Sequence, residues 1–274
     1  MGACYNIAMD LMLVILLSVV QGITEFLPIS SDGHLLVAEN CVEGYWIHPP
    51  DAMELNIVLH VGTFFSILVI YGRRAIRLLT HDRRVLGLLV VGTLPAVVVG
   101  LPLDRWFEDW LENPLLAGCM LPLTGLILIW GSRRPVGNVA YEDLSYRNAL
   151  IIGLCQATAL LPGISRSGTT IVAGLAVGMR RDAAATFSFL LALPAVGGAC
   201  LLRLIKIAAA GSSTTPAALL ITGAAVSFVV GVFALWWLIR WLESGRLHYF
   251  AWWCIALGLG MVAWQLAGLS GWKA

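Results

Sequence analysis

The chain has 274 residues, of which 59% are hydrophobic and 12% are charged, and its mean hydropathy is +0.86. Soluble domains carry about 25% charged residues, so this composition excludes a secreted disulfide scaffold and a disordered regulator. The formal net charge of +1 excludes a basic protein that follows a nucleic-acid backbone, and no nucleic-acid partner is expected. We therefore predict an all-α, polytopic integral membrane protein with a single membrane domain over residues 1–274.

Six apolar stretches are long enough to cross a bilayer as helices, since a spanning helix needs roughly 17 to 25 residues. They lie near 55–72, 85–103, 115–131, 183–206, 217–239 and 250–268. Two further apolar regions, 7–40 and 149–179, are each interrupted by a polar turn that contains proline. Each predicts two half-helices joined at membrane depth, where non-helical backbone is tolerated only when it is buried in protein or lines a watery cavity.

The basic residues predict the orientation, because cytoplasmic loops are enriched in lysine and arginine. If each broken region is a re-entrant hairpin and each span crosses once, one side receives most of them: Arg73, Arg74, Arg77, Arg83, Arg84, Arg133, Arg134, Arg147, Arg180, Arg181, Arg240 and Arg246. The other side receives Arg105, Arg203, Lys206 and Lys273. The first side is therefore predicted to be cytoplasmic.

The two broken regions also predict an internal repeat. The segments QGITEFLPISSDGHLL (21–36) and GLCQATALLPGISRSGTTI (153–171) both lead through polar residues into Leu-Pro, a serine pair and a glycine. Three spans follow each hairpin, and because three is odd the second copy would be inverted in the membrane. We expect repeat 1 at about 7–135 and repeat 2 at about 145–270, with a binding site where the broken helices meet.

The first turn carries side chains that are costly in hydrocarbon and therefore indicate function. Gln21 and Glu25 are four residues apart, so they project from one helical face. They are followed by Ser30, Ser31, Asp32 and His34. Such a set can bind a divalent cation and supply a nucleophile or a base. The alternative is an interhelical polar clasp, which the Glu25 carboxylate fits poorly.

The second turn has the composition of a phosphate site. It combines one arginine with hydroxyls and glycines: Gly163, Ser165, Arg166, Ser167, Gly168, Thr169 and Thr170. Glycine lets the backbone approach a ligand, the following half-helix directs N–H groups at an anion, and arginine offers a planar fork that matches phosphate oxygens. The pattern is not a P-loop, because no GK[ST] follows at that motif's spacing.

Two other residue types are given less weight. His60 lies within the first span, where a packed or pore-facing histidine is as consistent with the sequence as a ligand. The eleven tryptophans fall largely near span ends, where an aromatic belt belongs, and none is assigned to substrate binding.

Both turns resemble the signature motifs of the BacA/UppP family of undecaprenyl pyrophosphate phosphatases. In that family (E/Q)xxxE precedes Pro-x-Ser-Ser-x-x-His, which here runs from Gln21 to His34, and PGxSRSxxT matches every fixed letter from Pro162 to Thr170. The resemblance extends from about residue 12 to residue 206 and includes FSFLLALP at 187–194. The last spans match in hydropathy and length alone.

The resemblance implies a phosphatase that removes the terminal phosphate of undecaprenyl pyrophosphate, which recycles the carrier lipid for cell-wall synthesis and confers bacitracin resistance. It implies a site at the outer face of the bacterial cytoplasmic membrane and a need for Mg²⁺ or Ca²⁺. Glu25 with Gln21 would be the acidic pair, and Ser31 and His34 the candidates for nucleophile or base. The pyrophosphate would be held by Ser165, Arg166, Ser167 and Thr170.

Some assignments stay open. Gln21 is the neutral choice at its position and Asp32 stands where a small residue is expected, so a cation that needs two carboxylates would take Glu25 and Asp32. Attack by Ser31 or His34 would give a phospho-enzyme, whereas His34 as a base would activate water. The alternative function is a transporter or flippase of a polyprenyl phosphate or another anionic substrate. A homodimer is also left open.

Overall fold

The computed structural model describes residues 2–47, 50–106, 113–210 and 215–268. Within these ranges the regular structure is helical, and β pairing is limited to an isolated bridge between Val139 and Met179. The helices that are long and apolar enough to span a bilayer are α3 (Ala52–Thr80), α4 (Arg83–Trp106), α6 (Pro114–Ser132), α9 (Arg181–Ala210), α10 (Ala217–Glu243) and α11 (His248–Leu266). They confirm the predicted spans and a multi-pass membrane protein.

Each of the two broken regions forms a helical hairpin. The first consists of α1 (Gly2–Thr24) and α2 (Ser31–Val42), and the second of α7 (Tyr146–Thr158) and α8 (Arg166–Ala176). Two short 3-10 helices, η1 (Glu43–Tyr45) and η2 (Tyr141–Asp143), lie in the connections. The first half-helix of each hairpin ends four residues before the proline of its turn, α1 at Thr24 before Pro28 and α7 at Thr158 before Pro162. Proline has no N–H to donate to the carbonyl four residues earlier.

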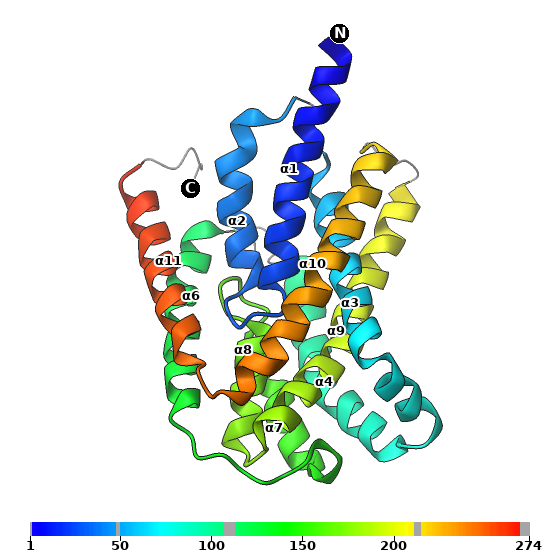
Figure 1. Ribbon diagram of the computed structural model, residues 1–274, viewed down its shortest axis with the longest axis vertical. Coiled ribbons are helices and arrows are strands. Elements are labelled where there is room, and N and C mark those ends of the chain that lie inside the picture. Colours follow the sequence, from blue (N-terminus) through cyan, green and yellow to red (C-terminus); the bar gives the residue numbers. More distant parts are fainter. Residues whose placement is uncertain (1, 48–49, 107–112, 211–214, 269–274) are drawn as a thin grey trace.

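The two hairpins enter from opposite ends of the molecule, and their turns meet near its middle (Figure 1). Helix α1 packs against α10, α7 packs against α4, and α6 runs along α11. A hairpin followed by three long helices thus occurs twice in chain order. An inverted repeat, with copies at about 7–135 and 145–270, remains a prediction.

Close helix packing fixes the frame around the turns. Gly125 of α6 faces the Ala251 carbonyl of α11, and a Cβ at Gly125 would lie 2.7 Å from that oxygen. Small residues let helices approach in membranes, where apolar burial gives little driving force between them. Behind the turns, Phe26 packs edge-on against Phe189 at 6.0 Å, within the main core cluster.

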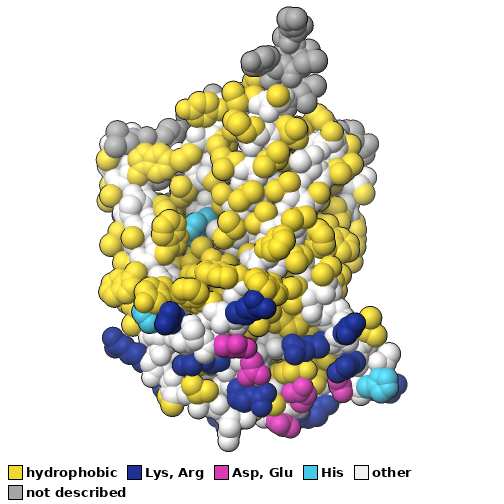
Figure 2. All heavy atoms as spheres, in the orientation of Figure 1, with side chains coloured by type: hydrophobic (Ala, Val, Ile, Leu, Met, Phe, Trp, Pro, Cys, Tyr) yellow, Lys and Arg dark blue, Asp and Glu magenta, His cyan; other side chains and the backbone are white. Residues whose placement is uncertain are grey.

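Charged side chains gather at one end of the visible face, and an apolar band covers the rest (Figure 2). At span ends, arginines lie over tryptophan rings, with Arg134 at 3.8 Å from Trp130 and Arg240 at 3.6 Å from Trp236. Such pairs suit a membrane–water interface, where one side of the ring is apolar and the other is wet. All four residues belong to or adjoin the side predicted to be cytoplasmic.

Candidate active site

Glu25 joins the two hairpin turns. It follows directly on α1 and is 7% exposed. Its Oε1 accepts a hydrogen bond from Nη2 of Arg166 at 2.6 Å, although the two residues are 141 positions apart. A buried carboxylate is costly unless it is paired and hydrogen-bonded. Arg166, which belongs to the other hairpin, therefore supplies the positive charge that a buried Glu25 carboxylate needs.

The second oxygen of Glu25 collects the remaining polar groups of the first turn. Its Oε2 accepts hydrogen bonds from Ser31 Oγ at 2.9 Å and from Gln21 Nε2 at 3.2 Å. The structure thus brings together four of the predicted site residues, namely Gln21, Glu25, Ser31 and Arg166. A hydroxyl that already donates to a carboxylate is arranged to lose its proton, which is the geometry of an activated nucleophile.

His60 also belongs to this cluster. Its Nε2 lies 3.7 Å from Glu25 Oε2, and its Nδ1 lies 2.9 Å from the Asn56 carbonyl, which can only accept. Nδ1 therefore carries the hydrogen and Nε2 faces the carboxylate. In the sequence, a packed or pore-facing histidine fitted His60 as well as a ligand did. The signal that pointed to a role was an ionisable side chain inside a span.

Hydroxyl groups hold the second turn, through bonds within it and to neighbouring segments. Ser165 caps α8, since its Oγ accepts the Gly168 N–H at 3.1 Å, while Thr170 Oγ1 lies 2.6 Å from Ser188 Oγ of α9. Ser167 Oγ donates to the Leu27 carbonyl at 3.2 Å and so ties this turn to the first. Side chains predicted to hold pyrophosphate are therefore engaged in shaping the loop around Arg166.

A residue outside both motifs supports the second turn. Thr124 of α6 donates its hydroxyl to the Gly163 carbonyl at 2.8 Å and accepts the Ser165 N–H at 3.0 Å. Gly163 has φ +89°, and a Cβ there would lie 2.3 Å from the Ala117 carbonyl, so the position needs glycine. The sequence offered no signal for Thr124, because a threonine in a span is most often packed against its own helix.

Several buried polar atoms around the two turns lack a hydrogen-bond partner among the described residues. They include Gln21 Oε1, Ser30 Oγ, Arg166 Nη1 and Thr169 Oγ1. Leaving a buried donor or acceptor unpaired costs about 1–3 kcal/mol, and more for a charged group. An Arg166 nitrogen without a partner beside its paired one leaves a donor for an anionic ligand. This is the arrangement that a phosphate-binding site requires.

His34 is held from both sides. Its Nδ1 lies 2.7 Å from the Ser30 carbonyl, and its Nε2 lies 2.7 Å from Nε1 of Trp253 on α11. Both ring nitrogens are therefore engaged. Trp253, which the sequence left among the belt tryptophans, is a neighbour of the site.

The donors present fit a cation only if the substrate contributes ligands. Asp32 is exposed at the start of α2, while Glu25 is committed to Arg166 and its neighbours. Within the described part of the chain, no three His, Cys, Asp or Glu side chains converge closely enough to hold a metal ion. Mg²⁺ is usually bound by one or two carboxylates together with water and substrate phosphates. Glu25 and Asp32 suit such shared coordination, and not a site in which the protein supplies every ligand.

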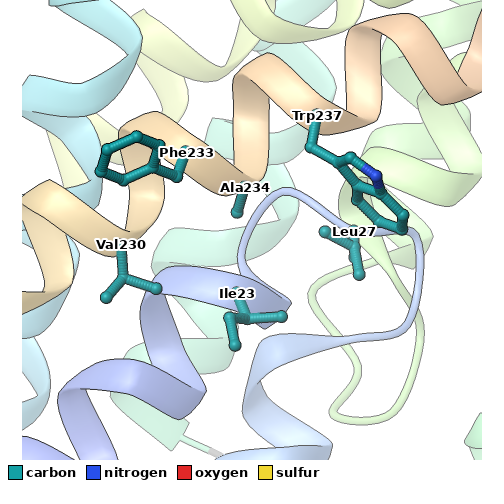
Figure 3. A pocket seen from close by; sticks show the side chains of 6 residues that line it. All are labelled: Ile23, Leu27, Val230, Phe233, Ala234 and Trp237. Atoms are coloured by element: carbon teal, nitrogen blue, oxygen red, sulfur yellow. The ribbon is translucent and has the colours of Figure 1, made fainter.

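An apolar groove lies beside α1 (Figure 3). It has a volume of about 390 Å³ and lies between α1 and α10, lined by Ile23, Leu27, Val230, Phe233, Ala234 and Trp237. Ile23 is two residues from both Gln21 and Glu25, which places it on the opposite face of the helix. The groove is therefore separate from the polar cluster.

Known proteins resemble this chain over most of its length. Residues 14–260 match a family model described as bacitracin resistance protein BacA. A Rhodopirellula baltica protein named undecaprenyl-diphosphatase is 48% identical over 258 residues, which cover 94% of this chain and 99% of the relative. Desulforapulum autotrophicum has a protein of the same name that is 35% identical, with 92% and 97% covered. Undecaprenyl-diphosphatase 4 of Bacillus cereus is 35% identical, with 91% and 95% covered. The chain, with both turns inside the matched residues, belongs to the BacA family.

Proposed function

We propose that this protein is an undecaprenyl-diphosphatase, which hydrolyses undecaprenyl pyrophosphate to undecaprenyl phosphate and inorganic phosphate. The proposal rests on the Glu25–Arg166 ion pair, which joins the two motif turns. Ser31 donates a hydrogen bond to the same Glu25 carboxylate. The names of the relatives and the family description support the substrate class and the link to bacitracin resistance. A lipid with a diphosphate head fits a polar site enclosed by membrane helices.

In this proposal Ser31 is the nucleophile. Its hydroxyl proton passes to Glu25 Oε2, 2.9 Å away, while Oγ attacks the terminal phosphorus and the bond to the bridging oxygen breaks. Undecaprenyl phosphate leaves. The Glu25 carboxylate, after losing that proton to solvent, accepts a proton from the attacking water and returns one to Ser31 Oγ as inorganic phosphate departs. His34 is given no proton step, because both its nitrogens are engaged.

Arg166 supplies the charge for the transferred group. Nη2 pairs with Glu25, and Nη1 has no partner among the residues that the structure describes, so the second donor is available to a phosphate oxygen. Donors held in place before the reaction stabilise developing charge without reorganisation. A divalent cation bound with the substrate by Glu25 and Asp32 would neutralise further phosphate charge. We place the protein in the bacterial cytoplasmic membrane with the site facing the outer side, as the arginines on the opposite side indicate.

The deciding experiment measures phosphate release from undecaprenyl pyrophosphate by the detergent-purified protein. We expect release that EDTA abolishes and Mg²⁺ or Ca²⁺ restores, and that Arg166→Ala lowers by about 10²–10³-fold. The matched control is Arg180→Ala, which removes an arginine from an exposed ion pair with Asp182 at 3.1 Å. Movement of the lipid across liposomes without phosphate release would instead show a flippase and refute the phosphatase.

A further inference from the structure

Trp253 of α11 and His34 of α2 form a series of two hydrogen bonds that ends on the backbone of the first turn. The indole N–H of Trp253 donates to His34 Nε2 at 2.7 Å, and His34 Nδ1 lies 2.7 Å from the Ser30 carbonyl. The planes of the Trp253 and His34 rings are 16° from parallel, and their centroids are 6.1 Å apart. This series of hydrogen bonds leads from α11, through His34 near the start of α2, to Ser30, the residue before Ser31.

The partners at the two ends fix the state of the imidazole. A carbonyl oxygen only accepts and an indole N–H only donates, so His34 carries its hydrogen on Nδ1 and a lone pair on Nε2. That lone pair is occupied by Trp253. A histidine in this state has no nitrogen left with which to take a proton or attack phosphorus. Its two bonds instead transmit the position of α11 to Ser30.

Ser30 is the residue that needs such support. Its φ is +70°, which makes it the one described residue other than glycine with a positive φ. This conformation is uncommon for residues with a Cβ and persists where surrounding contacts impose it. The Ser30 hydroxyl is buried without a partner in the described part of the chain, so the contacts that hold the residue fall on its carbonyl. Ser31, whose Oγ lies on Glu25, follows directly.

Helix α11 contacts the same turn at a neighbouring residue. The thiol of Cys254 lies 3.8 Å from the Pro28 carbonyl and is buried. Consecutive residues of α11 thus contact the carbonyls of Pro28 directly and of Ser30 through His34. Helix α11 itself packs closely along α6, which sets the position of both residues.

We propose that Trp253 and His34 are positioning residues, which hold Ser30 in its left-handed conformation and so direct Ser31 at the reacting phosphate. This inference rests on the proposed function and deepens it. It gives the histidine of the first motif a hydrogen-bonding task in place of acid–base chemistry. It also assigns a task to α11, which the motifs do not reach.

The first test separates positioning from proton transfer at His34. The amide of glutamine presents a donor and an acceptor on either side of one carbon, as the two imidazole nitrogens do, but it is not a base. We expect His34→Gln to retain kcat within about fivefold of the wild type, a loss that one weakened hydrogen bond explains. His34→Ala should lower kcat about 100-fold, since small displacements of a reacting group cost that much.

The second test removes the indole N–H alone. Trp253→Phe keeps an aromatic ring at this position, and we expect kcat to fall about fivefold while KM for the lipid stays the same, because the lost bond ends on His34 and not on substrate. Trp252→Phe is the matched control, since Trp252 is also an exposed tryptophan of α11 and should leave both constants unchanged. Equal thermal stability of the two variants would show that both are folded.

Two results would overturn the proposal. One is a loss in His34→Gln as large as that in His34→Ala, which would make His34 the base. The other is a Trp253→Phe variant that matches Trp252→Phe in kcat. Nitrogen-15 NMR of histidine-labelled protein detects the Trp253–His34–Ser30 hydrogen bonds without turnover. His34 should show the neutral Nδ1–H tautomer, and its nitrogen chemical shifts should change in Trp253→Phe and not in Trp252→Phe. If the wild type released no phosphate, the proposed function would fail, while this spectrum would still decide whether the two hydrogen bonds of His34 exist.

Discussion

The two hairpin turns have similar sequences but are stabilised in different ways. In the second turn, the Ser165 hydroxyl caps α8 and a glycine occupies the left-handed position at Gly163. In the first turn, a serine occupies that kind of position at Ser30, and neither helix cap nor hydroxyl supports it. The support comes from His34 and, through it, from α11.

This difference separates two tasks within one site. The second turn is a rigid platform that presents Arg166, and most of its polar side chains are used to build it. The first turn presents Glu25 and Ser31 toward that platform, and its one residue with a positive φ, Ser30, is supported through His34 from α11. Chemistry on a phosphate needs both, because charge stabilisation requires fixed donors and attack requires a correctly placed nucleophile.

The largest effect should come from breaking the link between the turns. Glu25→Gln or Arg166→Gln alone leaves one buried charge without its partner, which costs about 3–5 kcal/mol of stability. The double variant removes both charges and should unfold closer to the wild-type temperature than either single variant does. Phosphate release should be lost in all three. Thermal unfolding in detergent measures the cycle, and strictly additive losses would contradict the pairing of Glu25 with Arg166.

A smaller effect should follow from a methyl group in the second turn. Gly163→Ala places a Cβ 2.3 Å from the Ala117 carbonyl at φ +89°, so we expect a loss of about 1–3 kcal/mol from backbone strain. Gly198→Ala is the control, because a Cβ there meets nothing within 4 Å. An unchanged unfolding temperature in Gly163→Ala would show that the second turn is less rigid than the first.

The smallest effect should come from the support that α6 gives to the second turn. Thr124→Val keeps the side-chain shape and removes the hydroxyl that bridges Gly163 and Ser165. We expect the free energy of unfolding to fall by about 1 kcal/mol, the lower end of the cost of leaving buried polar groups unpaired. Thr222→Val is the control, since that exposed hydroxyl bonds to its own helix at Ala218. If both variants unfold at the same temperature, the second turn holds its shape by its own contacts alone.

Much of the architecture could be predicted from the sequence because membrane helices follow local rules. Length and hydropathy located the spans, and the prolines with polar neighbours located both breaks. The polar letters of the turns also indicated Glu25, Ser31 and Arg166, because ionisable groups in apolar surroundings are costly and need a purpose. The outcome for these residues agrees with the cluster that the structure forms.

The contacts between the turns and the long helices could not be predicted in the same way. His60, Thr124 and Trp253 lie in spans where nothing in the local pattern distinguishes them from packing residues. Likewise, the letters Ser-Arg-Ser predicted an anion site but not that Ser165 and Ser167 hydrogen-bond within the protein. Such assignments depend on which atoms of distant segments lie within about 3 Å, which is a property of packing.

The sequence by itself therefore determined a helical membrane protein with two broken regions and the residue types of a phosphate site, because hydrophobic length and the cost of buried charge act locally along a chain. The tertiary structure alone decided that Arg166 neutralises Glu25, that Ser31 shares that carboxylate, and that α11 reaches Ser30 through His34. Hydrogen bonds act over a few ångströms, so these pairings exist only once helices from both halves of the chain are packed around the turns.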